Sequence, residues 1–471
     1  MEAKRCLFDE ILLFIGFIII ICMVQTYIWP QDDFLRDVIS YKYSLDYRNL
    51  YIHSPLMTQY KQYILFDYIL GVFSRYNIVS VIWYVKNLMI IMYSVPVWLI
   101  VKKLVKNHHP DVPLKLQVNY VIFYSTLIMV FLSTPIVCSR PQVLFGIWTM
   151  YSYLIYTSSN IKFLKFYKIL WVFIGIVLIP FYWLAVFYLP AILFVFKSNK
   201  NRLYTLIAFL MINFLIWNHL SNGQWIQSFS LTNEQLSNRV PGYIISENMN
   251  PYLFLFFTLS NCTNVFNLFL LYLTIDCFIK SKLNFKLFNF KKFIEVFNKY
   301  PEILFILIYL STNMNKYLLV MYPILIFSYI KYVKIIPFCI EQKGQVLMML
   351  ASLLLGFSLM SPGDNIPIRQ SLSIPKDSKV LSTFNGANFI IPIINKNTVK
   401  IFPSMEIGAG EKQYQQLALD IEEGLPIDCK LLSKSDFEYV ATKKVKYNNQ
   451  TDNCLQIYET SPSISVFKII R

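Results

Sequence analysis

The chain has 471 residues, of which 56% are hydrophobic and 17% aromatic, with a mean hydropathy of +0.48 and a formal net charge of +16. Apolar runs recur from residue 11 to residue 360, which excludes a soluble globular protein and predicts an integral membrane protein. Basic residues interrupt these runs instead of forming one stripe, and no nucleic-acid motif accompanies them, so no nucleic-acid partner is expected.

The positive charge follows a membrane topology. From residue 362 onward, 13 Lys and Arg face 12 Asp and Glu, so the excess belongs to the residues before it. There, every second loop between apolar segments is basic, as the positive-inside rule requires of cytoplasmic loops. We expect about eleven membrane helices, at 9–29, 78–101, 117–136, 142–158, 166–180, 182–196, 203–220, 252–279, 301–312, 317–331 and 345–361.

This pattern predicts a polytopic α-helical membrane protein in the inner (plasma) membrane. An odd number of spans places the N-terminus in the cytoplasm and the C-terminus outside. No small-x-small cleavage site follows the first segment, so we interpret it as a retained helix. The stretch 166–196 can instead be one broken helix.

Two outer loops and a C-terminal domain complete the predicted organisation. The transmembrane domain covers 1–361, with outer loops at 30–77 and 221–250. The first loop is rich in tyrosines, which either form an interfacial belt or contact substrate. The second either covers a site or has no role. From residue 362 to 471, short apolar runs and a helical stretch near 414–424 predict a small α/β extracytoplasmic domain, with the runs at 379–381, 388–394 and 439–441.

The cysteines predict no metal site, because they lack metal-ligand spacing. Only Cys429 and Cys454 fall in the predicted outer domain. An oxidising compartment allows these two to pair, which makes them a candidate disulfide, and two free thiols are the alternative.

An acidic pair, Asp32 and Asp33, directly follows the first hydrophobic segment. A carboxylate at this position can act as general base on an acceptor that attacks a sugar carbon whose leaving group is a lipid phosphate. Two adjacent carboxylates raise each other's pKa when partly desolvated, which keeps one of them available near neutral pH. A helix cap or a solvated loop is the alternative reading.

A leaving phosphate needs cationic partners, and the chain offers few that face outward. These candidates for binding the lipid phosphate or sugar are Arg36, with its neighbour Asp37, Arg140, Arg239 and Lys316. Arg140 lies in a very short outer connection, and arginine donates bidentate hydrogen bonds to phosphate. The alternative is that Arg140 reaches lipid headgroups and that Lys316 anchors its helix at the interface.

Two segments resemble the GT-C superfamily of membrane glycosyltransferases, which includes protein O-mannosyltransferases and the lipid A aminoarabinose transferase. Pro30-Gln31-Asp32-Asp33 is similar to its acidic motif, and Lys316-Tyr317-Leu318-Leu319 with Pro323 is similar to its late basic-Tyr-Leu-Leu…Pro pattern. The resemblance implies that Asp32 or Asp33 is the catalytic carboxylate and that Arg140 and Lys316 contact the lipid phosphate. The second acidic residue is Asp where the family often has Glu, which leaves a divalent cation, Mg²⁺ or Mn²⁺, open as a cofactor.

The resemblance also implies the reaction. A polyprenyl-phosphate sugar would be the donor, a glycan, lipid or protein of the cell envelope the acceptor, and transfer would invert the anomeric carbon. Membrane lipids are the remaining expected partners. Two alternatives stay open: a polysaccharide polymerase, and a transporter of lipid-linked glycans, which would need charged or broken helices near mid-membrane.

Overall fold

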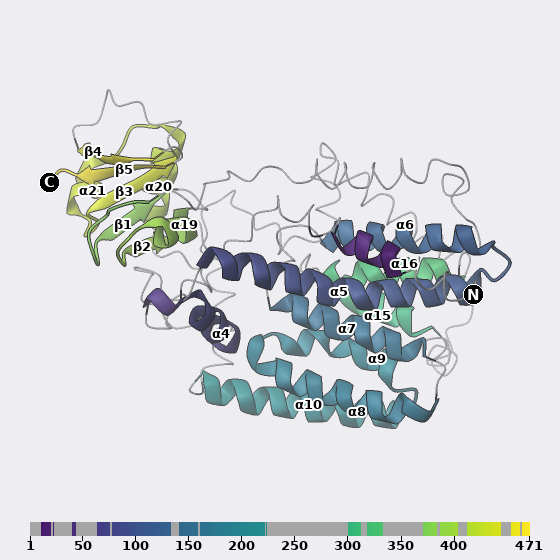
Figure 1. The fold of residues 1–471 in the computed structure, drawn as a ribbon. Helices are drawn as coiled ribbons and strands as arrows, with labels where there is room; N and C mark the ends of the chain where they lie inside the picture. Colours follow the sequence, from purple (N-terminus) through teal and green to yellow (C-terminus); the bar gives the residue numbers. More distant parts are fainter. Residues whose placement is uncertain are drawn as a thin grey trace, which may run out of the picture.

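The computed structural model describes a helical part and a C-terminal sheet with its own helices. The described residues are 11–19, 22, 40–43, 64–75, 78–132, 141–158, 161–221, 223, 300–311, 318–332, 371–383, 387–403, 412–443, 454–461 and 464–471. Figure 1 shows the long helices side by side in one elongated body, which we call the helical part. The sheet lies beyond one end of that body, and we call it, with its helices, the sheet unit.

Four helices form the centre of the helical part. They are α5 (Ile78–His108), α6 (Leu114–Leu132), α7 (Gln142–Tyr156) and α16 (Leu318–Tyr332), and both α5 and α16 contact each of the other three. α7 buries every residue from Phe145 to Met150, so it is covered on all sides. A helix that is apolar all round needs such a central place or a lipid surrounding. A shorter helix, α15 (Pro301–Ser311), packs against α16.

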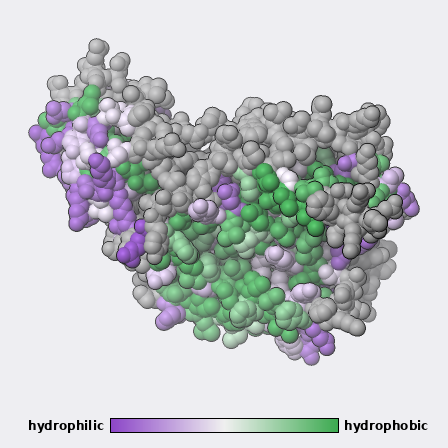
Figure 2. Space-filling model, in the orientation of Figure 1, coloured by the Kyte–Doolittle hydropathy of each residue, from purple (hydrophilic) through white to green (hydrophobic). Residues whose placement is uncertain are grey.

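Two further long helices, α8 (Ile161–Leu178) and α10 (Asn199–Leu220), lie on the outside of this centre. They expose large apolar side chains, among them Phe166, Phe173 and Met211, each at least 60% exposed. Figure 2 shows the resulting hydrophobic surface over the helical part and a more hydrophilic surface on the sheet unit. Such exposed apolar faces are unfavourable in water and suit a bilayer.

By length and composition, three helices among the described residues could cross a membrane. They are Tyr84–His108, Leu164–Phe181 and Asn199–Leu220. Of the other expected spans, 252–279 and 345–361 lie outside the described residues, and 9–29 is described only over 11–19 and at 22. The number of about eleven spans therefore stays a prediction.

The chain between α8 and α10 is broken rather than continuous. After α8 come η3 (Ile179–Phe181), η4 (Ala185–Ala191) and the short α9 (Ile192–Val195). The span expected at 182–196 is thus a turn, a seven-residue 3-10 helix and a four-residue α-helix rather than one continuous helix. Two prolines, Pro180 and Pro190, explain the break, because proline lacks the backbone N–H that a continuous helix needs.

Side chains from other helices donate hydrogen bonds to carbonyls that the break leaves without a helical backbone partner. Trp217 Nε1 donates to Ile179 O at 3.0 Å, and Tyr309 OH donates to Phe187 O at 2.6 Å. An apolar surrounding tolerates irregular backbone only where such partners exist. The broken stretch is therefore held from α10 and α15.

A pair of stacked indoles joins α7 to α8. The rings of Trp148 and Trp171 are 4.1 Å apart, and each indole N–H donates to the other residue's carbonyl, at 2.9 and 3.2 Å. Gly175 lies against this pair: a Cβ there would be 2.5 Å from Trp148 Cζ2 and 2.7 Å from Phe209 Cζ. Only glycine fits this close approach.

The sheet unit has five strands in the order β2-β1-β3-β5-β4. β1 (Lys379–Ser382) is parallel to its neighbours β2 (Lys400–Pro403) and β3 (Tyr439–Lys443), whereas β5 (Ile464–Ile469) pairs antiparallel with β3 and with β4 (Leu455–Thr460). The runs expected at 379–381 and 439–441 are strands, and the run at 388–394 lies in a helix, α19 (Ala387–Ile394). The helical stretch expected near 414–424 is α20 (Lys412–Glu423).

Alternating side chains bury both faces of this sheet. On one face Leu381 and Val440 belong to a core that α20 completes with Leu417. On the other face Val380 packs in the core that contains Ile391 of α19. Successive side chains of a strand point to opposite faces, so a strand covered on both sides needs a continuous apolar run.

A disulfide ties the first of these faces together. Cys429 begins α21 (Cys429–Lys434), and its sulfur is bonded to that of Cys454, directly before β4. These are the two cysteines that the sequence made a candidate pair. The bond closes a separation of 25 residues between α21 and the edge strand.

Candidate functional site

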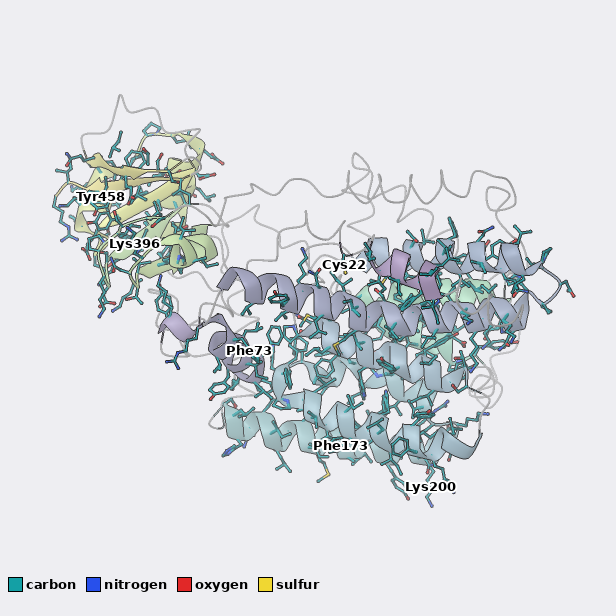
Figure 3. The ribbon with its side chains drawn as sticks, in the orientation of Figure 1. Cys22, Phe73, Phe173, Lys200, Lys396 and Tyr458 are labelled. Atoms are coloured by element: carbon teal, nitrogen blue, oxygen red, sulfur yellow. A yellow bond between two sulfur atoms is a disulfide. The ribbon has the colours of Figure 1, made fainter. Side chains whose placement is uncertain are left out.

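The helical part has two ends with different side chains. At one end the last turn of α16 meets the first turn of α15 through Lys331 and Glu302, and we call this the basic end. The other, the sheet end, carries η1 (Ser40–Tyr43) and α4 (Ile64–Ser74), which contact each other and the start of the broken stretch. In Figure 3, Lys200 and Phe73 mark the two ends.

The seven predicted site residues all lie outside the described residues. They are Asp32, Asp33, Arg36, Asp37, Arg140, Arg239 and Lys316. Two of them, Arg140 and Lys316, directly precede described helices in the sequence.

The helices that follow Arg140 and Lys316 pack against each other. α7 begins two residues after Arg140, and α16 begins two residues after Lys316. A Cβ on Gly146 would be 3.0 Å from Leu319 Cδ1, and Tyr93 OH donates to Leu319 O at 2.9 Å. Both helices have their other termini at the basic end, so these first turns share the sheet end. The two cationic candidates are attached to neighbouring helix starts.

Buried polar side chains also gather toward the sheet end. Asp67 on α4 is 5% exposed and Lys86 on the contacting helix α5 is fully buried. Asn87 Oδ1 and Gln142 Oε1 are buried and receive no hydrogen bond from the described residues. Buried charges in a helical bundle are costly, and buried acceptors usually have a partner, so this end has features typical of a functional site.

Lys42 of η1 reaches the sheet unit. Its Nζ donates to Pro392 O at 3.0 Å and to Asn395 O, two carbonyls at the C-terminal end of α19. A lysine at this position satisfies orphan carbonyls and places positive charge at the negative end of the helix dipole. Burial lowers the pKa of Lys42 to about 8, so the contact is protected from water.

Tyr43, the next residue, binds the start of β2. Its hydroxyl donates to Val399 O at 3.0 Å and accepts from Val399 N at 3.1 Å, so it pairs with both backbone groups of one residue. Tyr43 is 6% exposed, and burial raises the pKa of its hydroxyl. The ring therefore sits inside the junction.

The loop that receives these side chains is rigidly built. Asn395 is 1% exposed, its Oδ1 accepts from Ile374 N at 2.8 Å, and its Nδ2 donates to Ile374 O at 3.1 Å. Asp377, at a positive φ of 60°, has its backbone N–H bonded to Thr398 O at 2.8 Å. The carbonyls that Lys42 meets are thus fixed by the sheet unit's own hydrogen bonds.

The basic end holds a closed network around one carboxylate. Glu302 is fully buried and accepts from Lys331 Nζ at 2.8 Å, Tyr153 OH at 3.1 Å and Tyr332 OH at 3.3 Å. Lys331 also donates to Tyr156 OH at 3.0 Å. Both carboxylate oxygens are occupied by donors from α7 and α16, which suits helix packing better than chemistry.

No motif or spacing in the sequence indicates this network. The available signal was a lone carboxylate at the start of an otherwise apolar run, Pro301-Glu302-Ile303-Leu304-Phe305. An isolated charge beside apolar residues predicts a buried partner, although not which one.

Comparisons with known proteins add no family to this picture. A scan of protein-family models and a search of curated proteins each find no match to the chain. Within the described ranges, no group of three or more His, Cys, Asp or Glu side chains is placed to hold a metal ion.

Proposed function

We propose that the protein is a membrane glycosyltransferase that moves a sugar from a polyprenyl-phosphate donor to a cell-envelope acceptor, a glycan, a lipid or a protein, outside the plasma membrane. The supporting observation is the packing of the first turns of α7 and α16, which brings the chain next to Arg140 and Lys316 to one end. The first outer loop is attached at the same end through α4 and η1.

In the proposed reaction, one carboxylate of the Asp32–Asp33 pair takes the proton from the acceptor nucleophile, a hydroxyl in the simplest case. The acceptor oxygen then forms a bond to the anomeric carbon as the bond to the phosphate oxygen breaks, which inverts that carbon. Arg140 and Lys316 stabilise the polyprenyl phosphate that leaves, because fixed cations lower the free energy of a developing anion. The proton remains on the carboxylate until solvent removes it.

The acidic pair lies outside the described residues, and Asp33 precedes Ser40 by seven residues in the sequence. Ser40 begins η1, which contacts α4 and is joined to the sheet unit. The donor lipid would approach from the membrane, beside the exposed apolar faces of the helical part.

The test is transfer of radiolabelled sugar from a panel of polyprenyl-phosphate sugars to membrane extracts. We expect the Asp32→Asn/Asp33→Asn double variant to lose transfer while its expression and membrane insertion match the wild type. Asp111→Asn is the matched control, because Asp111 is exposed in the α5–α6 turn beyond the basic end of α5. Full transfer by the double variant would sink the assignment of the base.

One observation favours the transporter alternative. The broken stretch between α8 and α10 resembles the discontinuous helices around which transporters build their sites. Proteoliposomes with fluorescent polyprenyl-phosphate sugar distinguish the two functions. Movement of the lipid between leaflets without sugar transfer would favour transport, and transfer without movement would favour the glycosyltransferase.

A further inference from the structure

We propose that the basic ends of α8 and α10 form a binding site for the head group of an anionic phospholipid. The lysines of this site come from the first half of α8, from the start of α10 and from the turn before it. They are Lys165, Lys168, Lys197 and Lys200. The inference depends on the membrane setting of the helical part and goes beyond the proposed function, since it involves neither the proposed reaction nor its residues.

The fold brings lysines from separate helices to one place. Lys168 Nζ lies 5.6 Å from the centre of the Phe196 ring, so this side chain of α8 reaches the end of α9. Phe196 directly precedes Lys197 in the chain. Lys200 lies at the start of α10, which contacts both α8 and α9. The ammonium groups therefore gather at the basic end of the two outer helices.

These ammonium groups have no counter-charge in the part of the chain that the structure describes, where no Asp or Glu forms an ion pair with any of the four. Arg202, close by on α10, differs because its guanidinium donates to two backbone carbonyls. Lys168 is half-buried, and the other three lysines are exposed. Like charges that lie together without an acidic partner favour an anionic ligand.

The surface next to the lysines favours a lipid over a soluble anion. Exposed apolar side chains follow Lys165 on α8 and Lys200 on α10. They are Phe166, Ile169, Phe173, Val177, Leu203 and Tyr204. Figure 3 shows Lys200 at the end of the helical part and Phe173 nearer its middle.

The length of this apolar surface matches one leaflet of a bilayer. From Phe166 to Val177, α8 rises about 16 Å, close to the ~15 Å hydrocarbon thickness of a single leaflet. Free phosphate would contact only the lysines. A phospholipid would place its phosphate at the lysines and its acyl chains along the apolar side chains, which removes both the unpaired charge and the exposed apolar surface.

The charge of the head group distinguishes anionic from zwitterionic phospholipids. The positive-inside rule places a basic end of this kind in the cytoplasm, where the facing leaflet carries anionic lipids. The head group of phosphatidylglycerol keeps a net negative charge next to the lysines, whereas the choline of phosphatidylcholine cancels that of its phosphate. Because the lysines are mostly exposed, salt should weaken the attraction.

The experiment measures the binding of single lipids to the full-length protein by native mass spectrometry after transfer to detergent micelles. The probes are phosphatidylglycerol, phosphatidylcholine with the same acyl chains, and a polyprenyl phosphate. The test variant is Lys168→Gln/Lys197→Gln/Lys200→Gln. A second variant replaces the same three lysines with arginine, which keeps the positive charge and tests whether charge is what the site requires.

The control variant loses the same net charge elsewhere. It is Lys376→Gln/Lys396→Gln/Lys430→Gln, which changes three exposed lysines of the sheet unit. All substitutions except that of Lys168 are at exposed positions, and surface substitutions of this kind usually change stability little. The arginine variant and the salt dependence of the wild type test the site without removing its charge.

We expect the wild type to bind phosphatidylglycerol about tenfold more tightly than phosphatidylcholine, and the test variant to lower this preference to about twofold or less. The arginine variant and the control variant should keep the preference of the wild type. Raising the ionic strength from about 0.1 M to about 0.5 M should reduce the preference of the wild type several-fold, because exposed charges are screened.

Four results would overturn the inference. Equal affinity of the wild type for the two phospholipids would show that no such site exists. An undiminished preference in the test variant would assign it to other residues. An equal loss in the control variant would reduce the effect to net charge. Binding of the polyprenyl phosphate without binding of phosphatidylglycerol would make the ligand a donor-type lipid instead of a bilayer phospholipid. None of these outcomes depends on sugar transfer, so the proposed function can fail separately.

Discussion

At each end of the helical part, a basic side chain donates hydrogen bonds to the carbonyls at the end of a short helix. The two basic residues differ in how far they are from that helix in the sequence. At the basic end Arg202 donates Nε to Phe196 O at 2.6 Å and Nη2 to Leu193 O at 3.1 Å, six and nine residues away. At the sheet end Lys42 does the same for α19 from 350 residues away.

The same chemistry therefore has two consequences. Arg202 stabilises the turn between α9 and α10, which are already adjacent in the chain. Lys42 joins two segments that are far apart in the sequence. The basic end also closes its charges on itself through Glu302 and Lys331. The sheet end keeps buried acceptors that no described residue satisfies, at Asn87 and Gln142. A network in which every buried polar group has a partner favours stability, whereas buried polar groups without a partner are typical of functional sites.

The largest expected effect comes from opening the basic-end network. Glu302→Leu leaves the Lys331 ammonium largely buried without its carboxylate, which should lower the free energy of unfolding by about 3 kcal/mol. The midpoint of thermal unfolding in detergent micelles measures this change.

The double variant Glu302→Leu/Lys331→Met provides the control. It removes both charges and should recover most of the lost stability, because an apolar pair needs no compensating partner. A double variant as unstable as Glu302→Leu alone would contradict the view that the pair is self-contained.

Removing the local cation should have a smaller effect. Arg202→Met deprives two carbonyls at the end of α9 of a charged donor and should cost about 2 kcal/mol, concentrated in the α9–α10 turn. Hydrogen exchange of the amides between residues 192 and 202 measures it. Lys200→Met, two residues away and exposed, should change stability by under about 0.5 kcal/mol. Equal effects of the two variants would remove the capping role.

The smallest effect is a pH dependence of the sheet-end contact. Burial lowers the pKa of Lys42 to about 8, below its usual 10.5, so above pH 8 the attached state binds fewer protons than the released state. Attachment should therefore strengthen as pH rises from 8 toward 10.5 and be insensitive to Lys42 below pH 8. Since Lys42 is partly exposed, we expect a change on the order of 1 kcal/mol.

Protection of the amides of residues 395–403 between pH 7 and pH 9.5 measures this slope, with intrinsic exchange rates corrected for pH. Lys42→Met should remove the difference between the two pH values, and Lys396→Met should leave it as in the wild type. A slope that is the same in the Lys42→Met protein would assign the pH dependence to another group.

Local patterns predicted much of the described fold. The apolar segments expected at 78–101, 117–136, 142–158 and 203–220 correspond to α5, α6, α7 and α10. The runs at 379–381 and 439–441 are strands buried on both faces, one of the two structures that a short, continuous apolar run predicts. The run at 388–394 is a helix instead, since a short apolar run alone does not distinguish strand from helix.

The broken stretch shows where local patterns stop being sufficient. Its composition is as apolar as that of a continuous span, and from the sequence a broken helix was only one of two alternatives. The break is stable because Trp217, Tyr309 and Arg202 satisfy its carbonyls. Those partners lie on other helices, or beyond a turn, and no periodicity within the stretch identifies them.

For the candidate site, too, the sequence and the structure supply different parts of the description. The sequence supplied the acidic pair and the two cations as a hypothesis based on residue type and position, and these residues lie outside the described ranges. The structure describes elements that follow them in the chain: the neighbouring first turns of α7 and α16, and η1, which contacts the end of α19 and Val399, the residue before β2. Neither the contacts of η1 nor the Glu302–Lys331 pair was predicted.

By itself, the sequence determined the local character of the segments: which stretches are long and apolar, which are short strands, and which two cysteines are available to pair in the outer domain. Only the tertiary structure decided that Lys42 and Tyr43 close the chain onto the sheet unit and that Glu302 meets Lys331. The physical reason is that composition and periodicity reflect only local preferences, the free energies of forming and burying a segment of a few helical turns or one strand. A contact across 350 residues exists only when the packing of the whole chain has offset the entropy of closing that loop.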